Sequence, residues 1–274
     1  MNSEILMKLV RYSKFNQEYS TGNTFGKELD ELLSDIAEID FSIQSAIHHP
    51  VKKNEKTVDK NKTSIEVEED SEIPMITEEW AKCDSIHDFS AMIQGCTKCG
   101  MLSKGRKNIV FGSGNPNAGI VVVGEAPGAD EDEQGLPFVG RAGRLLTDIL
   151  AAINLSRDEV YICNILKCRP PENRNPLPDE ISNCEPYLAR QLELIKPKLI
   201  LALGTFAAQT LLNTKEPLGK LRGRFHLYKN IKLMVTYHPA ALLRNPNWKR
   251  PTWEDVKMFR EEYDNIHGIT NERS

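Results

Sequence analysis

Residues 118–124 read AGIVVVG, a continuous apolar run that is typical of a strand buried on both faces of a sheet. Similar runs follow at residues 160–166 (VYICNIL), 198–203 (KLILAL) and 231–237 (IKLMVTY), with a shorter one at 225–228. Helical patterns lie between or after them, at residues 140–153, 179–195, 205–212 and 252–267. Strands that alternate with helices predict a mainly parallel sheet with helices on both faces. The expected fold class is therefore α/β, with three layers in the order α/β/α.

The composition excludes several classes of protein. The 274 residues include 35 basic and 39 acidic side chains, for a net charge of −4, and 40% of them are apolar. No run approaches the roughly 18 apolar residues that a membrane span needs, and the first residues lack the pattern of a secretory signal. Six cysteines are too few for a disulfide scaffold. We therefore expect a cytoplasmic globular protein that does not associate with membranes.

The chain divides into two parts of different character. Residues 29–47 carry apolar side chains at the three- and four-residue spacing of an amphipathic helix. Residues 50–73 are polar and charged without an aromatic side chain, which is typical of a linker. We expect an N-terminal helical and disordered extension over residues 1–76, which is a candidate surface for a protein partner. The compact domain is predicted at residues 77–274, and it begins with a helix over residues 77–94.

Polar side chains follow three of the predicted strands. Glu125 comes directly after the first strand, Asn164 lies near the end of the second, and His238 follows the last. Ligands of open α/β sheets bind beyond the carboxyl ends of the strands, so we expect these three side chains to meet at one rim. The turn GEAPG at residues 124–128 lacks the spacing of a phosphate-binding loop. The sequence therefore favours a site that orients water and binds a polar, planar ligand.

Four of the cysteines form two pairs. Cys96 and Cys99 make a CxxC motif, and fifteen residues separate Cys168 from Cys184. Four thiolates from two separate segments suit either a structural zinc ion or an iron–sulfur cluster, and composition does not separate these two. A redox dithiol is disfavoured, because the CxxC motif precedes the first strand instead of lying in a thioredoxin-like turn. The other two cysteines are Cys83 and Cys163, of which Cys163 is predicted to be buried within a strand.

Four motifs, in this order, resemble those of one enzyme family. They are GEAPGADED at 124–132, GLPFVGRAGRLL at 135–146, NILKCRPPENRNPLPDE at 164–180 and HPAALLR at 238–244. About residues 84–265 thus resemble the family 4 uracil-DNA glycosylases, which are iron–sulfur enzymes of bacteria and archaea. The resemblance implies a uracil-DNA glycosylase-like fold. It also implies hydrolysis of the N-glycosidic bond of uracil in DNA, which leaves an abasic site and initiates base excision repair.

The resemblance implies how the base is held. Phe138 matches the aromatic residue that stacks on uracil, and Asn164 matches the amide that reads the edge of the base. His238 matches the residue that contacts a uracil carbonyl, where it stabilises the negative charge of the leaving base. Ala126, in the same turn as Glu125, is also expected to line the substrate site.

Catalysis and the metal centre are implied in the same way. Glu125 matches an acidic residue that positions water or stabilises the cationic sugar, and Glu131 and Asn173 are weaker candidates to support that water. One relative traps the sugar covalently through an inserted basic loop with a histidine, and residues 168–177 contain no histidine, so turnover is expected. The four ligands of a structural [4Fe–4S] cluster, with zinc as the alternative occupant, correspond to Cys96, Cys99, Cys168 and Cys184.

Uracil-containing DNA is the expected partner of a monomeric protein located at the nucleoid. Leu242, Leu243 and Arg244 resemble the loop that inserts an apolar side chain into DNA and contacts a phosphate. The basic stretches at residues 220–224 and 248–250 are further candidate contacts to the DNA backbone.

Two other functions remain as alternatives. One is a catalytically silent iron–sulfur module that binds DNA during replication or repair, although a pure binder does not need Glu125, Asn164 and His238 together. The other is a zinc-stabilised nucleotide hydrolase, for which the sequence lacks evident phosphate or acidic metal ligands.

Overall fold

The computed structural model describes residues 79–268. The predicted helix at residues 29–47 and the predicted linker at 50–73 lie outside the described residues. The boundary between the extension and the compact domain therefore stays a prediction.

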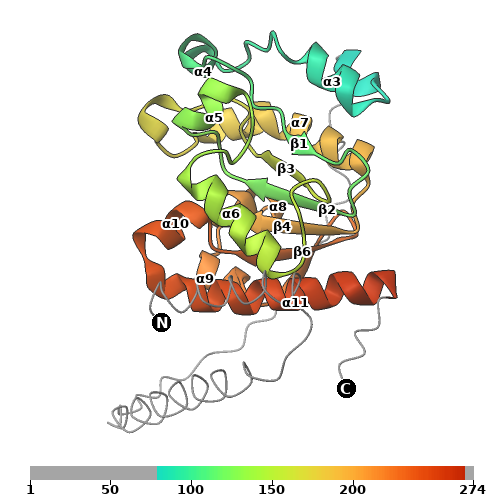
Figure 1. The fold of residues 1–274 in the computed structure, drawn as a ribbon. Coiled ribbons are helices and arrows are strands. Elements are labelled where there is room, and N and C mark those ends of the chain that lie inside the picture. Colours follow the sequence, from blue (N-terminus) through green and yellow to red (C-terminus); the bar gives the residue numbers. More distant parts are fainter. Residues whose placement is uncertain (1–78, 269–274) are drawn as a thin grey trace, which may run out of the picture. The chain divides into compact units, whose positions relative to one another are not determined.

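A six-stranded sheet forms the centre of the described domain (Figure 1). Its strand order is β1-β3-β2-β4-β6-β5, and the four inner strands run parallel while the two edge strands run antiparallel to their neighbours. The strands are β1 (Ser113–Gly114), β2 (Ile120–Gly124), β3 (Tyr161–Asn164), β4 (Leu199–Leu203), β5 (Phe225–Tyr228) and β6 (Ile231–Thr236). All predicted strands are present, and β1 is an additional strand of only two residues.

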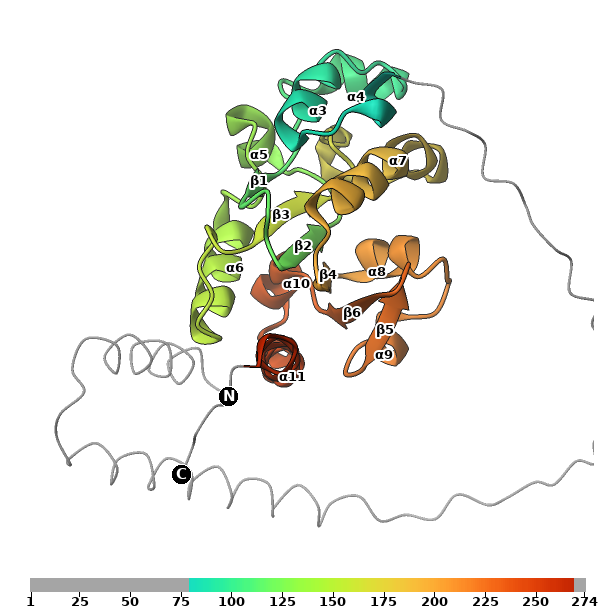
Figure 2. The ribbon, with the colours of Figure 1, turned by 90° about the vertical axis from the view of Figure 1, so that its right-hand side faces the viewer.

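Helices cover both faces of the sheet (Figure 2), which confirms the predicted three-layer α/β/α architecture. On one face, α6 (Arg141–Ala152) and α11 (Lys249–His267) pack against side chains such as Val122 and Leu201. On the other face, α7 (Pro178–Ile195) and α8 (Thr205–Leu211) pack against side chains such as Val123 and Ala202. The remaining helices are η1 (Glu79–Lys82), α3 (Ile86–Met92), α4 (Gly100–Gly105), α5 (Ala129–Gln134), η2 (Pro171–Asn173), α9 (Leu218–Leu221), α10 (Pro239–Arg244) and η3 (Pro246–Trp248).

The predicted helix over residues 77–94 is wrong as one continuous element. The structure has η1 and α3 there, separated by residues 83–85. Ser85 adopts an extended conformation, and its side chain accepts a hydrogen bond from the backbone N–H of Asp88, so it begins a new helix as an N-cap. Trp80 and Phe89 nevertheless stack on each other, with ring centroids 5.4 Å apart, so both short helices contribute to the core.

Within residues 79–268, none of the helices is both long and apolar enough to cross a membrane.

Candidate active site

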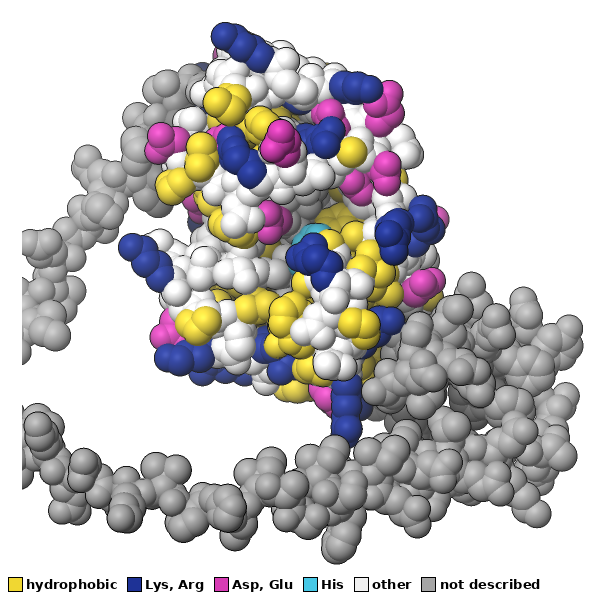
Figure 3. Space-filling model, turned by 90° about the vertical axis from the view of Figure 1, so that its left-hand side faces the viewer, with side chains coloured by type: hydrophobic (Ala, Val, Ile, Leu, Met, Phe, Trp, Pro, Cys, Tyr) yellow, Lys and Arg dark blue, Asp and Glu magenta, His cyan; other side chains and the backbone are white. Residues whose placement is uncertain are grey.

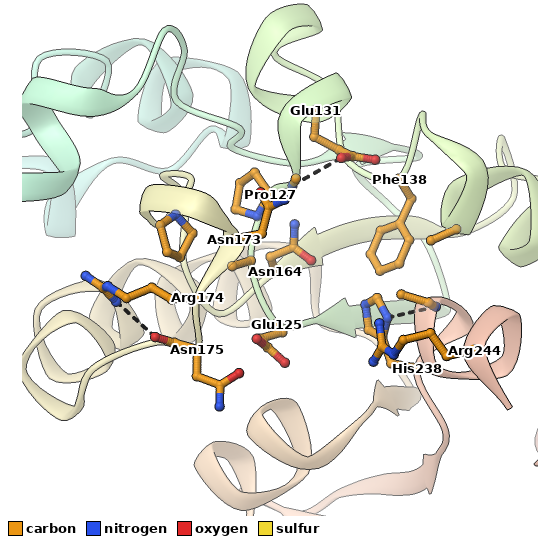
Figure 4. Close-up of a pocket in the computed structure, with 15 residues that line it drawn as sticks. Glu125, Pro127, Glu131, Phe138, Asn164, Asn173, Arg174, Asn175, His238 and Arg244 are labelled. Carbon is orange, nitrogen blue, oxygen red and sulfur yellow. Dashed lines mark hydrogen bonds between the residues drawn. The ribbon is translucent and has the colours of Figure 1, made fainter.

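The carboxyl ends of β2, β3 and β6 meet at one end of the sheet, as predicted, and they surround a cavity of about 360 Å³. Glu125, Asn164 and His238 line it together (Figure 4). Phe138, from the loop between α5 and α6, forms a further part of the wall. A volume in this range suits a small, planar ligand.

Asn164 is the last residue of β3, and only 1% of its surface is exposed. Its Oδ1 atom is buried and has no hydrogen-bond partner. Gly124 pairs with it across the sheet, and a Cβ atom there would lie 2.3 Å from Asn164 Oδ1 and 2.6 Å from Phe138 Cζ. Because an unpartnered buried carbonyl oxygen is costly, this atom indicates a binding position for an N–H group.

Phe138 is held in an unusual backbone conformation, with a φ angle of 54°. Its carbonyl oxygen accepts a hydrogen bond from Arg157 Nη1 at 3.1 Å, and Arg157 Nη2 donates to the carbonyl oxygen of Pro137 at 2.8 Å. A Cβ atom at Gly143 would lie 1.8 Å from the same Phe138 oxygen, so only glycine fits at the start of α6. These contacts fix the Phe138 ring with its centroid 5.4 Å from that of His238.

His238 is the N-cap of α10, and its Nδ1 atom accepts a hydrogen bond from the backbone N–H of Ala240 at 3.2 Å. In a neutral ring the hydrogen must then be on Nε2. Burial, and to a smaller extent the positive charge of Arg244, lower the pKa of His238 to about 4. His238 is therefore a neutral hydrogen-bond donor at physiological pH.

Glu125 places a carboxylate in the same cavity (Figure 4). Its burial raises its pKa above the usual carboxylate range, while the nearby charge of Arg244 acts in the opposite direction. When it is charged, a partly desolvated carboxylate can orient a water molecule or face a developing positive charge.

Glu131 lines the cavity, but both of its oxygens bind backbone groups. Oε1 accepts hydrogen bonds from the N–H groups of Val139 and Gly140, at 2.9 and 3.0 Å, and Oε2 accepts one from Gly128 at 3.1 Å. The carboxylate thus ties the turn after β2 to the loop that carries Phe138. Glu131 thus has a structural role, and its support of a water molecule stays a prediction.

Ala126, expected in the substrate site, and Asn173, expected to support a water molecule, both line the cavity, and their roles stay predictions. Asn173 adopts a φ angle of 54°, and its Oδ1 accepts a hydrogen bond from Arg169 Nε at 2.9 Å. Arg169 thereby orients the Asn173 amide at the edge of the cavity.

The segment that was expected to enter DNA is a short helix, α10. Leu242 is 1% exposed and belongs to the buried side chains of the protein, so its predicted role as an inserting side chain is wrong. Leu243 is 40% exposed and Arg244 is exposed at the edge of the cavity. The face of the molecule drawn in Figure 3 has a histidine side chain in a hollow, with basic and hydrophobic side chains beside it.

The sequence was compared with known families and proteins, and it matches an enzyme family. The family model of the uracil DNA glycosylase superfamily matches residues 111–257. The type-4 uracil-DNA glycosylase of Archaeoglobus fulgidus is 46% identical over 186 residues, which are 65% of this chain and 93% of that protein. The type-4 enzyme of Pyrobaculum aerophilum is 44% identical over 61% of this chain and 89% of its own length. The type-4 enzyme of Thermotoga maritima is 43% identical over 62% of this chain and 91% of its own length. The chain belongs to the type-4 uracil-DNA glycosylase family.

In this type-4 glycosylase the four paired cysteines line a second cavity. Each sulfur accepts one hydrogen bond from a different donor. The pairs are Tyr187 Oη to Cys96 (3.2 Å), Asn183 Nδ2 to Cys99 (3.8 Å), Arg106 Nη1 to Cys168 (3.3 Å) and Lys167 N to Cys184 (3.2 Å).

The electrostatics of this second cavity favour neutral thiols in the metal-free protein. Burial raises the pKa of Cys99 and Cys168, and it raises that of Cys184 to about 12. Among residues 79–268, no group of three or more histidine, cysteine and acidic side chains is arranged to hold a single metal ion. Four sulfurs on one cavity, each with an N–H or O–H donor, nevertheless form a donor set that fits an iron–sulfur cluster. The structure also confirms that Cys163 is buried, as predicted from its place within a strand.

One residue of the basic stretch 220–224 makes its contacts within the domain. Arg222 donates two hydrogen bonds to the buried carboxylate of Asp255 and lies over the ring of Tyr237. Arg222 is therefore a structural residue, which corrects its assignment as a contact to DNA. In the stretch 248–250, Trp248 stacks on Tyr237 with centroids 4.8 Å apart.

Three positioning residues were missed by sequence reasoning. Arg157, Gly143 and the structural role of Glu131 all depend on contacts with the backbone of the loop that carries Phe138. The glycine in GRAG and the proximity of Glu131 to PFVG were visible in the motifs, but nothing in their spacing indicated the contacts.

Proposed function

We propose that this chain is a monofunctional uracil-DNA glycosylase that excises uracil from DNA and leaves an abasic site for base excision repair. The observation that carries the proposal is the orphaned Oδ1 atom of Asn164, buried in a cavity with a neutral histidine and a carboxylate. Family membership supplies the reaction class.

Recognition of the base follows from the hydrogen-bonding pattern of its edge. Uracil presents an N3–H donor and an O4 acceptor, which match the Oδ1 acceptor and the Nδ2 donor of Asn164. Cytosine presents an acceptor at N3 and an amino group at C4, so both contacts become unfavourable. The base must leave the DNA stack to reach this cavity, and the ring of Phe138 then offers it a stacking surface.

The reaction replaces one bond at the sugar with another. The bond between uracil N1 and C1′ breaks, and its electron pair stays with the base. A water oxygen forms the new bond to C1′, one proton of that water remains on the sugar hydroxyl, and the other ends on uracil. Glu125 orients the water and faces the positive sugar, while His238 Nε2–H donates to the carbonyl that gains negative charge.

The four cysteines Cys96, Cys99, Cys168 and Cys184 would hold a [4Fe–4S] cluster. When bound, that cluster supplies a rigid covalent junction between the CxxC segment, the loop after β3 and helix α7. Base hydrolysis transfers no electrons, so the residues of the uracil cavity carry the chemistry by themselves.

Uracil-containing DNA is the proposed partner, contacted by Leu243 and Arg244 at the edge of the cavity. Because the substrate is DNA, we place the enzyme in the cytoplasm at the nucleoid, where it acts as a monomer. The silent DNA-binding module is disfavoured, since a binder gains nothing from a buried acceptor without a partner.

The test uses an end-labelled oligonucleotide with one uracil and a matched thymine control, incubated in EDTA and then treated with alkali. We expect strand cleavage only at uracil. An absence of cleavage by folded protein with absorbance near 400 nm would favour the silent binding module instead.

Asn164→Ala gives the residue-level test. Loss of both amide contacts should lower the single-turnover rate by about 100-fold or more, by analogy with the removal of one transition-state donor. Affinity for an abasic-site oligonucleotide should stay near that of the parent protein. Equal losses in rate and in product affinity would contradict the assigned role.

A further inference from the structure

Trp248 is an exposed aromatic side chain close in sequence to the uracil cavity. It ends η3, four residues after Arg244, which lines that cavity. Figure 1 shows α10, which carries Arg244, and the beginning of α11 at the same end of the domain. The Trp248 N–H donates to the carbonyl oxygen of Asn245 at 3.2 Å, and Thr252 Oγ1 donates to the carbonyl oxygen of Trp248 at 2.8 Å. These bonds fix the backbone that carries the indole next to the cavity-lining helix.

A second aromatic ring supports the indole. Tyr237 stacks on it almost in parallel, with centroids 4.8 Å apart and an angle of 9° between the planes. The guanidinium of Arg222 lies over the same tyrosine ring, 5.5 Å from its centroid, and is itself held by the buried carboxylate of Asp255. Trp248 keeps 38% of its surface exposed, although Tyr237 covers one face of its ring. The stack thus ends in a rigid aromatic surface that is open to solvent.

The side chains that flank this surface suit a strand of nucleic acid. Arg244 and Arg250 are exposed before and after Trp248 in the chain. Positive charge binds phosphates, whereas an aromatic ring binds bases by stacking and does so for every kind of base. A base within a duplex is covered on both faces by its neighbours, so only an unstacked base can offer a face to the indole.

We propose that Trp248 stacks on an unpaired base of single-stranded DNA, beside the uracil that enters the cavity. Arg244 and Arg250 contact the phosphates of the same strand. The inference rests on the proposed function, because it needs a DNA strand that enters the uracil cavity next to α10. It adds a preference to that function, since the indole strengthens the binding of single-stranded substrates and contributes little to the binding of duplexes.

The test measures the affinity for an oligonucleotide with a stable abasic-site analogue, as a single strand and as a duplex. Trp248→Ala should weaken binding of the single strand by about 5- to 100-fold, the usual effect of losing one stacked base, and binding of the duplex by less than about twofold. Trp248→Phe keeps an aromatic ring and should restore most of the affinity. Leu227→Ala is the matched control, because Leu227 is 65% exposed but pairs with Lys232 near the amino end of β6, at the opposite end of the strand from the cavity.

Tryptophan fluorescence reports the contact directly, because a stacked base quenches an indole. The chain has three tryptophans, of which Trp80 is buried and Trp253 is half-buried. The same single strand should quench the parent protein, and most of this quenching should be lost in Trp248→Phe although the affinity is kept. A merely structural role of Trp248 does not produce this combination. The fluorescence also decides the case if Trp248→Ala does not fold.

The other outcomes separate the inference from the function on which it rests. Parent-like affinity of folded Trp248→Ala for the single strand, or quenching that persists in Trp248→Phe, would overturn the inference. Equal losses for the single strand and the duplex would overturn the preference. A parent protein that leaves uracil DNA intact, yet shows quenching that depends on Trp248, would overturn the proposed function and keep the stacking contact.

Discussion

At the scale of single residues, the surroundings of the cavity shift the pKa values of Glu125 and His238 in opposite directions. Burial moves the pKa of Glu125 upward and that of His238 down to about 4, so both shifts disfavour charge in the cavity. The proposed mechanism needs a charged Glu125 and a neutral His238. The glycosylase therefore works only on the alkaline side of both pKa values.

The pH dependence of the reaction follows from these shifts. We expect kcat to fall with decreasing pH along one acidic limb, set by Glu125 at a pH above the ordinary carboxylate value of about 4.3. His238 adds no limb above about pH 5, because its pKa is about 4. Glu125→Gln should have a low rate without this limb. Single-turnover rates measured between pH 4.5 and 8 test this, and a limb that persists in Glu125→Gln would exclude Glu125 as its origin.

Stability depends on His238 in a related way. Its pKa in the folded protein lies below the unfolded value of about 6.5, so the unfolded chain binds the proton first. The contribution of neutral His238 to the free energy of unfolding is complete above pH 6.5, and it is lost as the pH falls from there toward about 4.

At the scale of elements, short contacts hold the loops of the cavity on helices and strands. The start of α6 touches the carbonyl of Phe138 through Gly143. Helix α11 is joined to β6 by Asp255, which is 0% exposed and accepts a hydrogen bond from Thr236 Oγ1 at 2.6 Å. Arg222 completes this junction from the end of α9.

Gly143→Ala should damage both stability and activity. Its Cβ atom would lie 1.8 Å from the Phe138 oxygen, so α6 or the Phe138 loop must move. We expect a loss of about 1–3 kcal/mol in the free energy of unfolding, the usual cost of overpacking, and a rate that falls at least tenfold. Gly219→Ala in α9 is the control, because its Cβ meets no atom within 4 Å. Equal stability of the two variants in urea unfolding would refute the contact.

Asp255→Ala should unfold more easily by about 3–5 kcal/mol, because Arg222 then loses its buried partner. Glu254→Ala, one residue away on α11, removes only an exposed ion pair with Lys257 and should cost less than about 1 kcal/mol. Chemical denaturation of both variants measures the difference. A cost for Asp255→Ala as small as that of the control would mean that the junction is dispensable.

Much of the fold could be predicted from the apolar runs, because buried parallel strands leave a strong signal in sequence. The two-residue strand β1 and the six-residue helix α10 leave no such signal, and the break before α3 depends on one capping hydrogen bond of Ser85. The convergence of Glu125, Asn164 and His238 was predictable, since each follows a strand. The burial of Leu242 and the clamp of Arg157 on Phe138 were not, because they depend on packing between segments.

At the scale of the whole molecule, the described residues contain every side chain assigned to the uracil cavity and to the cysteine cavity. The three type-4 relatives compared above align with only 61–65% of this chain, although they are covered over 89–93% of their own length. Residues 1–83 carry 10 basic and 17 acidic side chains, whereas the rest carries 25 and 22. The domain that binds DNA is thus joined to a strongly acidic segment.

Deletion of residues 1–76 should leave an active enzyme. A domain with its own core folds independently, so we expect kcat within about threefold of the full chain. Removal of net negative charge should also weaken neither DNA binding nor its salt dependence. Steady-state kinetics on the truncated protein measure kcat, and DNA binding at several salt concentrations measures the affinity and its salt dependence. A folded truncation without activity would assign a catalytic contribution to the extension.

The cysteine cavity also has a consequence for the order of events during synthesis. Cys96 is made 88 residues before Cys184 (184 − 96). At roughly 5–20 residues per second, the CxxC segment waits about 4 to 18 seconds on the ribosome before its last partner is translated. During that time its two thiols are exposed to oxidants and to stray metal ions. In the proposed four-cysteine centre, a ribosome that stalls before α7 therefore leaves Cys96 and Cys99 without Cys184, their last partner.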